Sequence, residues 1–257
     1  MADQHHRSQA LPRGRPPRQR ARRRRRHPET EEVTGQDLNW FFNQWYFNNG
    51  HPKLKISYNY VNGKAAVVTD QTQSGNLFRL PVAIDVYNGA NKKRHTVWIE
   101  NKSDTFYFPS ASKPTLINVD AEKILVAEKN DLKTKENWIE QWKYAGNFVD
   151  KKEALKAFSD NRMTQLAEGL NDKYAGVRLY TLQLFEEKKQ LITNESILQF
   201  EQLAETDPSK KVKAKAIEIL SFLKDKKYSN QFIKWVNDSS YSVAGAALQG
   251  VVILDPE

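Results

Sequence analysis

The spacing of apolar residues changes once along this chain, and that change limits its fold more than any other feature. Over residues 53–129 apolar and polar residues alternate, as at Leu54, Ile56 and Tyr58, which is the period of a half-buried β-strand. After residue 130 the period becomes helical and stays so to the end of the chain. Strands followed by helices, rather than alternating with them, predict an all-β part and an all-α part in one multi-domain chain.

Seven short strands are predicted in the first part. Asn62-Gly63 lies between two strand-like runs and favours a type I′ hairpin, and Asn88-Gly89 marks a later turn. The predicted strands are residues 54–61, 64–70, 78–87, 94–100, 104–108, 115–120 and 123–126. Because no helical segment interrupts them, they predict a small antiparallel β-sandwich over residues 53–130.

The helical part, residues 131–257, contains a repeated pattern. A helix is predicted to begin at Asp150, with Glu153 behind it. Further along, an aspartate stands five residues before a valine three times; the pairs are Asp172 and Val177, Asp207 and Val212, and Asp238 and Val243. Intervals of 35 and 31 residues between the aspartates resemble HEAT-type repeats and predict a HEAT-like α-solenoid. The alternative is a helical bundle whose aspartates only cap helices.

An aromatic helix is predicted within residues 31–52, before the sandwich. Thr34 can cap its start, with Asp37 in a capping-box-like position. Its apolar face, at helical spacing, consists of Leu38, Phe41, Phe42 and Trp45. Burying such side chains contributes roughly 1.5–3 kcal/mol each, yet the preceding residues contain almost nothing apolar. We therefore expect this to be the terminal helix of a missing domain. The helical repeats are also expected to be truncated, because Asp255-Pro256 is a helix-start signature at the end of the chain.

The positive charge lies in residues 1–30, an Arg/Pro-rich segment that is predicted to be a disordered tail. Residues 1–27 hold ten arginines and one acidic residue, which is the whole net charge of +9, and the 30 basic and 30 acidic residues of 28–257 cancel. One alternative is a nucleic-acid-binding arm at Arg22–Arg26. Since no aromatic residues are interleaved for base stacking, a nucleic-acid partner is not expected. A misassigned gene start is a further interpretation of this segment.

Signatures of catalytic chemistry are missing from the sequence. Cysteine is absent, so the chain has neither disulfides nor a thiol nucleophile. The histidines are His5, His6, His27, His51 and His95, and none belongs to an HExxH motif. No GxSxG elbow or glycine-rich phosphate loop occurs either. We predict no catalytic residue, no metal ligand and no cofactor in this chain. No apolar run is long enough for a membrane span, and the compartment is not predicted.

The order of parts, an aromatic helix, a β-sandwich and helical pairs, resembles the C-terminal half of the aminopeptidase N family of gluzincin zinc metallopeptidases. The segment TGQDLNWFFNQWYFNNGHPKLKISYNY is similar to the family's junction, where the last helix of the catalytic domain carries an FF-x-QW pattern. The matching residues are Phe41, Phe42, Gln44 and Trp45. LPVAIDV, residues 80–86, resembles an inner strand of the family's sandwich.

The resemblance implies a role beside a catalytic domain. Members of the family remove N-terminal residues from peptides, with zinc held by two histidines and a glutamate, a second glutamate as general base, and a GxMEN segment that binds the peptide amine. These motifs do not occur here. The chain is therefore expected to be a non-catalytic fragment, the spacer and cap over the active-site chamber, with the missing catalytic domain as its partner. The alternative is a stand-alone HEAT-repeat scaffold that binds a protein or peptide on its solenoid.

Overall fold

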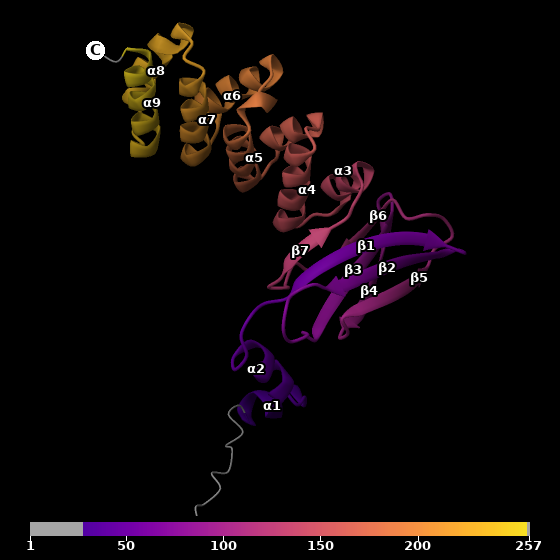
Figure 1. The fold of residues 1–257 in the computed structure, drawn as a ribbon. Helices are drawn as coiled ribbons and strands as arrows, with labels where there is room; N and C mark the ends of the chain where they lie inside the picture. Colours follow the sequence, from indigo (N-terminus) through magenta and orange to yellow (C-terminus); the bar gives the residue numbers. More distant parts are fainter. Residues whose placement is uncertain (1–27, 256–257) are drawn as a thin grey trace, which may run out of the picture. The chain divides into compact units, whose positions relative to one another are not determined.

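The computed structural model of the chain describes residues 28–255, which belong to two compact units; the first ends at Gly50 and the second begins at His51. In the first unit, α1 (Pro28–Thr34) is followed by α2 (Asn39–Trp45) (Figure 1). The prediction that Thr34 caps the aromatic helix is wrong. Thr34 ends α1, because Gly35 adopts a φ of +65° that breaks the helix there.

The helix α2 begins one turn later than Thr34 would place it. Its N-terminal cap position is Leu38, which has no side-chain cap, and Asp37 Oδ1 instead accepts a hydrogen bond from the backbone N–H of Asn39 at 2.8 Å. Such a short local turn competes with a helical start at this point. The segment that includes Arg22–Arg26 lies outside the described residues.

Residues 51–131 form two packed sheets. The strands are β1 (Lys53–Val61), β2 (Lys64–Gln71), β3 (Leu80–Asn88), β4 (Asn91–Ile99), β5 (Ser103–Pro109), β6 (Leu116–Val119) and β7 (Glu128–Asp131). One sheet has the order β5-β2-β1-β7 and the other β4-β3-β6. The alternation seen in the sequence is the burial pattern, since Leu54 and Ile56 are buried while Lys53 and Lys55 are exposed. The Asn62-Gly63 turn has φ values of +51° and +70°, as a type I′ hairpin requires.

The predicted seventh strand at residues 123–126 is wrong. Lys123 adopts a φ of +56°, and the Asp120 carboxylate accepts hydrogen bonds from the backbone N–H groups of Ile124 and Leu125, which fold this segment into a turn. The short apolar run Ile124-Leu125-Val126 favoured a strand, yet Ile124 and Val126 are both exposed. The last strand is β7, and it pairs parallel with β1. The sandwich is therefore antiparallel except at this one edge.

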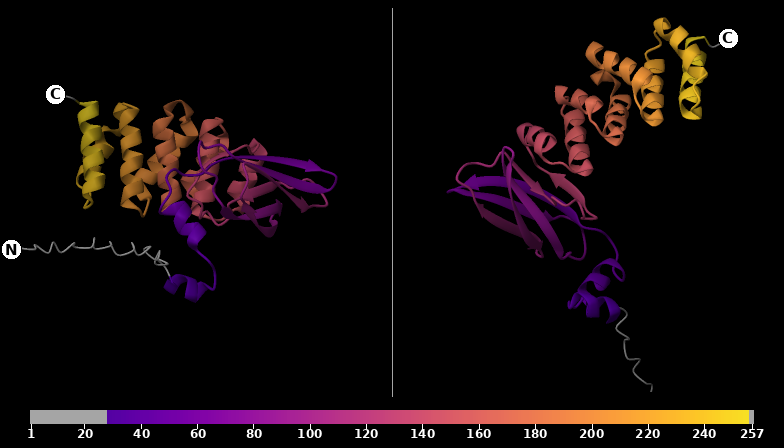
Figure 2. Two further views of the ribbon diagram at one scale, coloured as in Figure 1. Left: turned by 60° about the horizontal axis from the view of Figure 1, so that its bottom comes forward. Right: turned by 180° about the vertical axis from the view of Figure 1, so that it is seen from behind.

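Residues 135–254 form helices joined by short turns. The elements are α3 (Lys135–Tyr144), α4 (Phe148–Asp160), η1 (Thr164–Asn171), α5 (Ala175–Glu187), η2 (Lys189–Leu191), α6 (Asn194–Thr206), α7 (Lys210–Phe222), η3 (Lys226–Tyr228), α8 (Ser229–Val236) and α9 (Tyr241–Leu254). Helix α6 packs on α7, α8 on α9, and α7 on both α5 and α9, as Figures 1 and 2 show. The chain is thus a mixed β plus α fold, and the solenoid remains a prediction.

One local feature of the helical part differs from the sequence prediction. Helix α4 begins after Asn147 rather than at Asp150, and the Asp150 carboxylate reaches back to the Asn147 backbone N–H in a capping box. The segment before Asp172 is a 3-10 helix, η1. A buried core of aromatic and aliphatic side chains, including Phe158, Phe200 and Phe232, runs through the helices. Within residues 28–255, no helix has both the length and the apolar character to cross a membrane.

Candidate functional site

The two histidines of the described residues do not approach a common point. His51 Nε2 lies 2.5 Å from Glu128 Oε1, and the His95 ring stacks on Phe108 with ring centroids 4.4 Å apart. Within residues 28–255, no group of three or more His, Cys, Asp or Glu side chains could hold a metal ion. The residues described therefore do not fit the zinc that the family resemblance implies.

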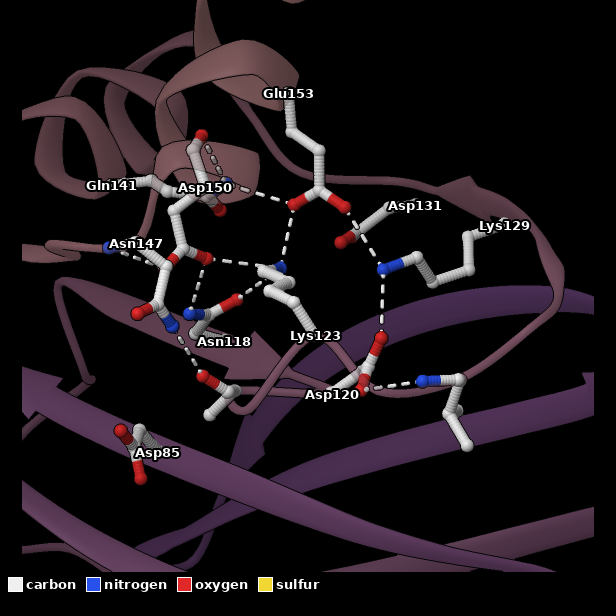
Figure 3. A network of polar contacts seen from close by, with 12 residues as sticks. Asp85, Asn118, Asp120, Lys123, Lys129, Asp131, Gln141, Asn147, Asp150 and Glu153 are labelled. Carbon is white, nitrogen blue, oxygen red and sulfur yellow. Dashed lines mark hydrogen bonds and ion pairs between the residues drawn. The ribbon is translucent and has the colours of Figure 1, made fainter. Parts of the chain in front are cut away.

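A buried network of ion pairs joins the sandwich to helix α4 (Figure 3). We call it the sandwich–helix joint; its members are Asn118, Asp120, Lys123, Lys129, Asp150 and Glu153. Asn118 belongs to β6, Asp120 and Lys123 to the turn after it, and Lys129 to β7. Asp150 and Glu153 belong to the first turns of α4. Of these residues the sequence singled out only Asp150 and Glu153, as helix-start residues. The two lysines could not be predicted, because both pair with Glu153, which lies more than 20 residues further along the chain.

Lys123 lies at the centre of the joint. Its side chain is 4% exposed, and its ammonium group lies 3.2 Å from Asn118 Oδ1, 2.9 Å from Asp150 Oδ1 and 2.6 Å from Glu153 Oε2. An ammonium group has three N–H donors, so three oxygens satisfy it fully. Because one acceptor comes from the sandwich and two from α4, Lys123 links the helix to the sheet, beside the direct hydrogen bond from Asn118 Nδ2 to Asp150 Oδ1 at 2.9 Å.

Glu153 bridges the two lysines of the joint. Its Oε2 faces Lys123, while its Oε1 lies 2.9 Å from Lys129 Nζ, which in turn lies 3.1 Å from Asp120 Oδ2. Burial alone would raise the pKa of Glu153, but the attraction of both lysines outweighs it and lowers that pKa to about 2. Burial likewise opposes the charge of Lys129, yet Glu153 and Asp120 raise its pKa. The joint therefore keeps its charges in a poorly solvated place.

A second buried pair continues the joint toward β1. Lys133 Nζ lies 2.6 Å from Asp131 Oδ2, and the Tyr58 hydroxyl donates to Asp131 Oδ1 at 2.6 Å. Burial is the main reason that the pKa of Tyr58 is raised and that of Lys133 is lowered. All of these groups have partners and little exposure, so the arrangement suits rigid attachment rather than contact with a substrate.

The low pKa of Glu153 makes the free energy of unfolding depend on pH in the acidic range. Because the folded pKa is about 2 and the ordinary value is 4.5, the carboxylate contributes stability above about pH 4.5, and that stability is lost as pH falls toward 2. A shift of this size corresponds to about 3 kcal/mol. We expect urea unfolding at pH 5.5 and pH 3 to differ less in E153Q than in the wild type. Parallel pH profiles for the two proteins would contradict this assignment.

The three aspartates of the repeated sequence pattern, which we call the repeat markers together with their valines, have one local role and one long-range role. The carboxylates of Asp172, Asp207 and Asp238 each accept the backbone N–H two residues on, from Tyr174, Ser209 and Ser240, at 2.8 Å. Each also pairs with a cation from a helix earlier in the chain; the cations are Lys151, Arg178 and Lys210 respectively. The associated valines, Val177, Val212 and Val243, are fully buried in the helical core. The markers thus shape the turn before a helix and bind it to a preceding helix.

The predicted junction residues lie in or beside α2. Leu38, Gln44, Phe42 and Trp45 are half-buried, Phe41 is 42% exposed, and no residue of α2 is fully buried. Phe41 packs edge-on against Phe42, with ring centroids 5.4 Å apart. The aromatic face therefore exists, and the structure assigns it no ligand.

Comparison with known proteins supports the fold but not a family. No protein-family model matches the sequence, and no curated protein matches it. The chain is similar to the crystal structure of Legionella pneumophila aminopeptidase A in complex with aspartic acid, with a TM-score of 0.61 and 12% identity, over 85% of this chain and 33% of that one. The chain thus corresponds to about a third of the length of that aminopeptidase. At this identity the likeness is one of fold.

Proposed function

We propose that this chain is the non-catalytic part of a zinc aminopeptidase, the spacer and cap beside the active-site chamber. The observation that carries the proposal is the likeness of 85% of the chain to a third of an aminopeptidase structure. The sequence supports it, because the FF-x-QW pattern is present at Phe41–Trp45 while HExxH and GxMEN are absent. Zinc and the peptide-cleaving groups would then belong to the catalytic domain.

The sandwich–helix joint supports the same role. A cap controls access to a chamber only if it is held in a fixed position, and the buried ion pairs between Lys123, Asp150 and Glu153 hold α4 on the sandwich. Charged pairs in such a place are costly to separate. They fit a part whose task is positioning.

The first experiment measures zinc and hydrolysis in the purified chain. We expect substoichiometric zinc by elemental analysis, and no cleavage of aminoacyl arylamides above that of a mock preparation. The variant H51A/H95A is the matched control, because it removes the two histidines that the structure describes. Stoichiometric zinc together with cleavage that the double substitution abolishes would overturn the proposal.

The second experiment tests the partner. A zinc aminopeptidase catalytic domain, expressed without its own sandwich and helices, is mixed with this chain and separated by size-exclusion chromatography. We expect the two to migrate together, and F41D to prevent it, because Phe41 is a partly exposed member of the aromatic face. V33D, at an exposed position of α1, is the control and should bind normally. Failure of the unmodified chain to comigrate counts against the cap role.

A further inference from the structure

Three Asn-Gly pairs occur in the chain, and their sequence numbers are 49–50, 62–63 and 88–89. In such a pair the backbone nitrogen of the glycine can attack the side-chain amide carbon of the asparagine. Glycine has no Cβ that would hinder the approach. Because the reacting groups are the same in all three pairs, their reactivity depends on how the fold holds each one.

The pair Asn62-Gly63 is held by a hairpin. The attack requires rotation about the Cα–C bond of the asparagine, until the glycine nitrogen lies beside the side chain. Asn62 and Gly63 form the turn between β1 and β2 with positive φ at both residues, and Val61 pairs with Lys64 on either side of it. The rotation would therefore break a type I′ turn and the end of the hairpin.

The pair Asn88-Gly89 is held by hydrogen bonds. Asn88 is the last residue of β3 and pairs with Asn91 of β4. The N–H of Gly89, which carries the attacking nitrogen, donates to Thr115 Oγ1 at 3.0 Å. This bond must break before the nitrogen can turn toward the side chain of Asn88.

The pair Asn49-Gly50 has neither restraint. Both residues are exposed, and neither belongs to a helix or strand. Gly50 adopts a φ of +87°, and a Cβ there would meet no atom within 4 Å. The backbone N–H of Asn49 donates to Asn48 Oδ1 at 3.1 Å. Among residues 28–255, however, neither the side-chain amide of Asn49 nor the N–H of Gly50 has a hydrogen-bond partner. The reacting atoms are thus open to solvent.

We propose that Asn49-Gly50 is a site of spontaneous deamidation, selected by the fold from the three pairs. The nitrogen of Gly50 forms a bond to Asn49 Cγ, and the side-chain nitrogen leaves as ammonia with the proton of the Gly50 amide. Water then opens the cyclic imide at either carbonyl and gives aspartate or isoaspartate. The product has a new negative charge at the end of the unit that contains α2, and isoaspartate also adds a methylene group to the main chain. This proposal is independent of the aminopeptidase proposal.

The test is incubation of the folded full-length chain at mildly alkaline pH, followed by peptide mapping with mass spectrometry. We expect conversion of Asn49 to be about fivefold or more faster than that of Asn88, because loss of the Gly89 hydrogen bond alone gives that factor. Asn62 should also be slower than Asn49. Isoaspartyl methyltransferase, which labels isoaspartate, should label the peptide that contains Asn49, and N49Q should abolish that label. Equal rates at the three pairs, or slower conversion at Asn49, would overturn the proposal.

Two controls separate the effect of the fold from that of the neighbouring residues. In concentrated urea, with unfolding checked by circular dichroism, the three rates should converge, since only the fold restrains the pairs differently. T115V keeps the shape of the side chain but removes the acceptor of the Gly89 N–H, so it should accelerate conversion at Asn88 and leave Asn49 unchanged. If the order of the rates persists in urea, neighbouring residues rather than the fold select Asn49, and the proposal fails.

Discussion

Replacement of Lys123 by methionine is expected to lower the free energy of unfolding by about 3–5 kcal/mol, the usual cost of removing one partner of a buried ion pair. Methionine has a similar length, so the loss comes from charge rather than from an empty space. Asp150 and Glu153, whose side chains are 2% and 22% exposed, would then face each other without the cation between them. Urea denaturation followed by circular dichroism measures the change.

The matched control for Lys123 is Lys156, which undergoes the same change on the surface of α4. Its ammonium group pairs with Asp160 at 2.7 Å, but its side chain is 51% exposed. We expect K156M to cost less than about 1 kcal/mol. The double variant K123M/E153M should lose less than the sum of its single losses, because an apolar pair replaces an uncompensated charge. Equal losses in K123M and K156M would show that the joint does not stabilise the fold.

The joint also shows where sequence analysis reaches its limit. The period of apolar residues predicted the sandwich and the helices, because burial of alternate or helically spaced side chains is a local property of the chain. The role of Lys123 was hidden by the same property, since Ile124, Leu125 and Val126 after it form a short apolar run that is consistent with a strand. Its real conformation depends on acceptors at Asn118, Asp150 and Glu153, up to 30 residues away. No local window contains that information.

The repeat markers divide in the same way. Asp207 shapes the turn before α7 through the backbone N–H of Ser209, and this short-range role is visible in the sequence as an aspartate at a helix start. Its pairing with Arg178, 29 residues earlier, is a long-range contact that no short sequence window contains, and the same holds for the pairing of Asp172 with Lys151 and of Asp238 with Lys210.

Replacement of Arg178 by methionine should be the most damaging change among the repeat markers and their partners, at about 3–5 kcal/mol. The side chain of Arg178 is 10% exposed and donates two hydrogen bonds to the Asp207 carboxylate, of 2.7 and 2.8 Å. It also donates to the Asp172 carbonyl oxygen at 2.8 Å. Its loss leaves Asp207, whose side chain is 2% exposed, as a buried charge without a counter-ion. R178K keeps the charge but not the bidentate geometry, so an intermediate loss is expected.

The next turn along the chain supplies the control. Lys210 pairs with Asp238 at 2.9 Å, but its side chain is 48% exposed, and Lys213 also lies 3.8 Å from Asp238. We expect K210M to cost less than about 1 kcal/mol, because the second lysine and the solvent replace the lost partner. Urea denaturation gives the two losses, and hydrogen exchange should rise in α6 and α7 for R178M alone. If R178M and K210M are equally mild, packing of the buried valines rather than the aspartate pairs holds the helices together.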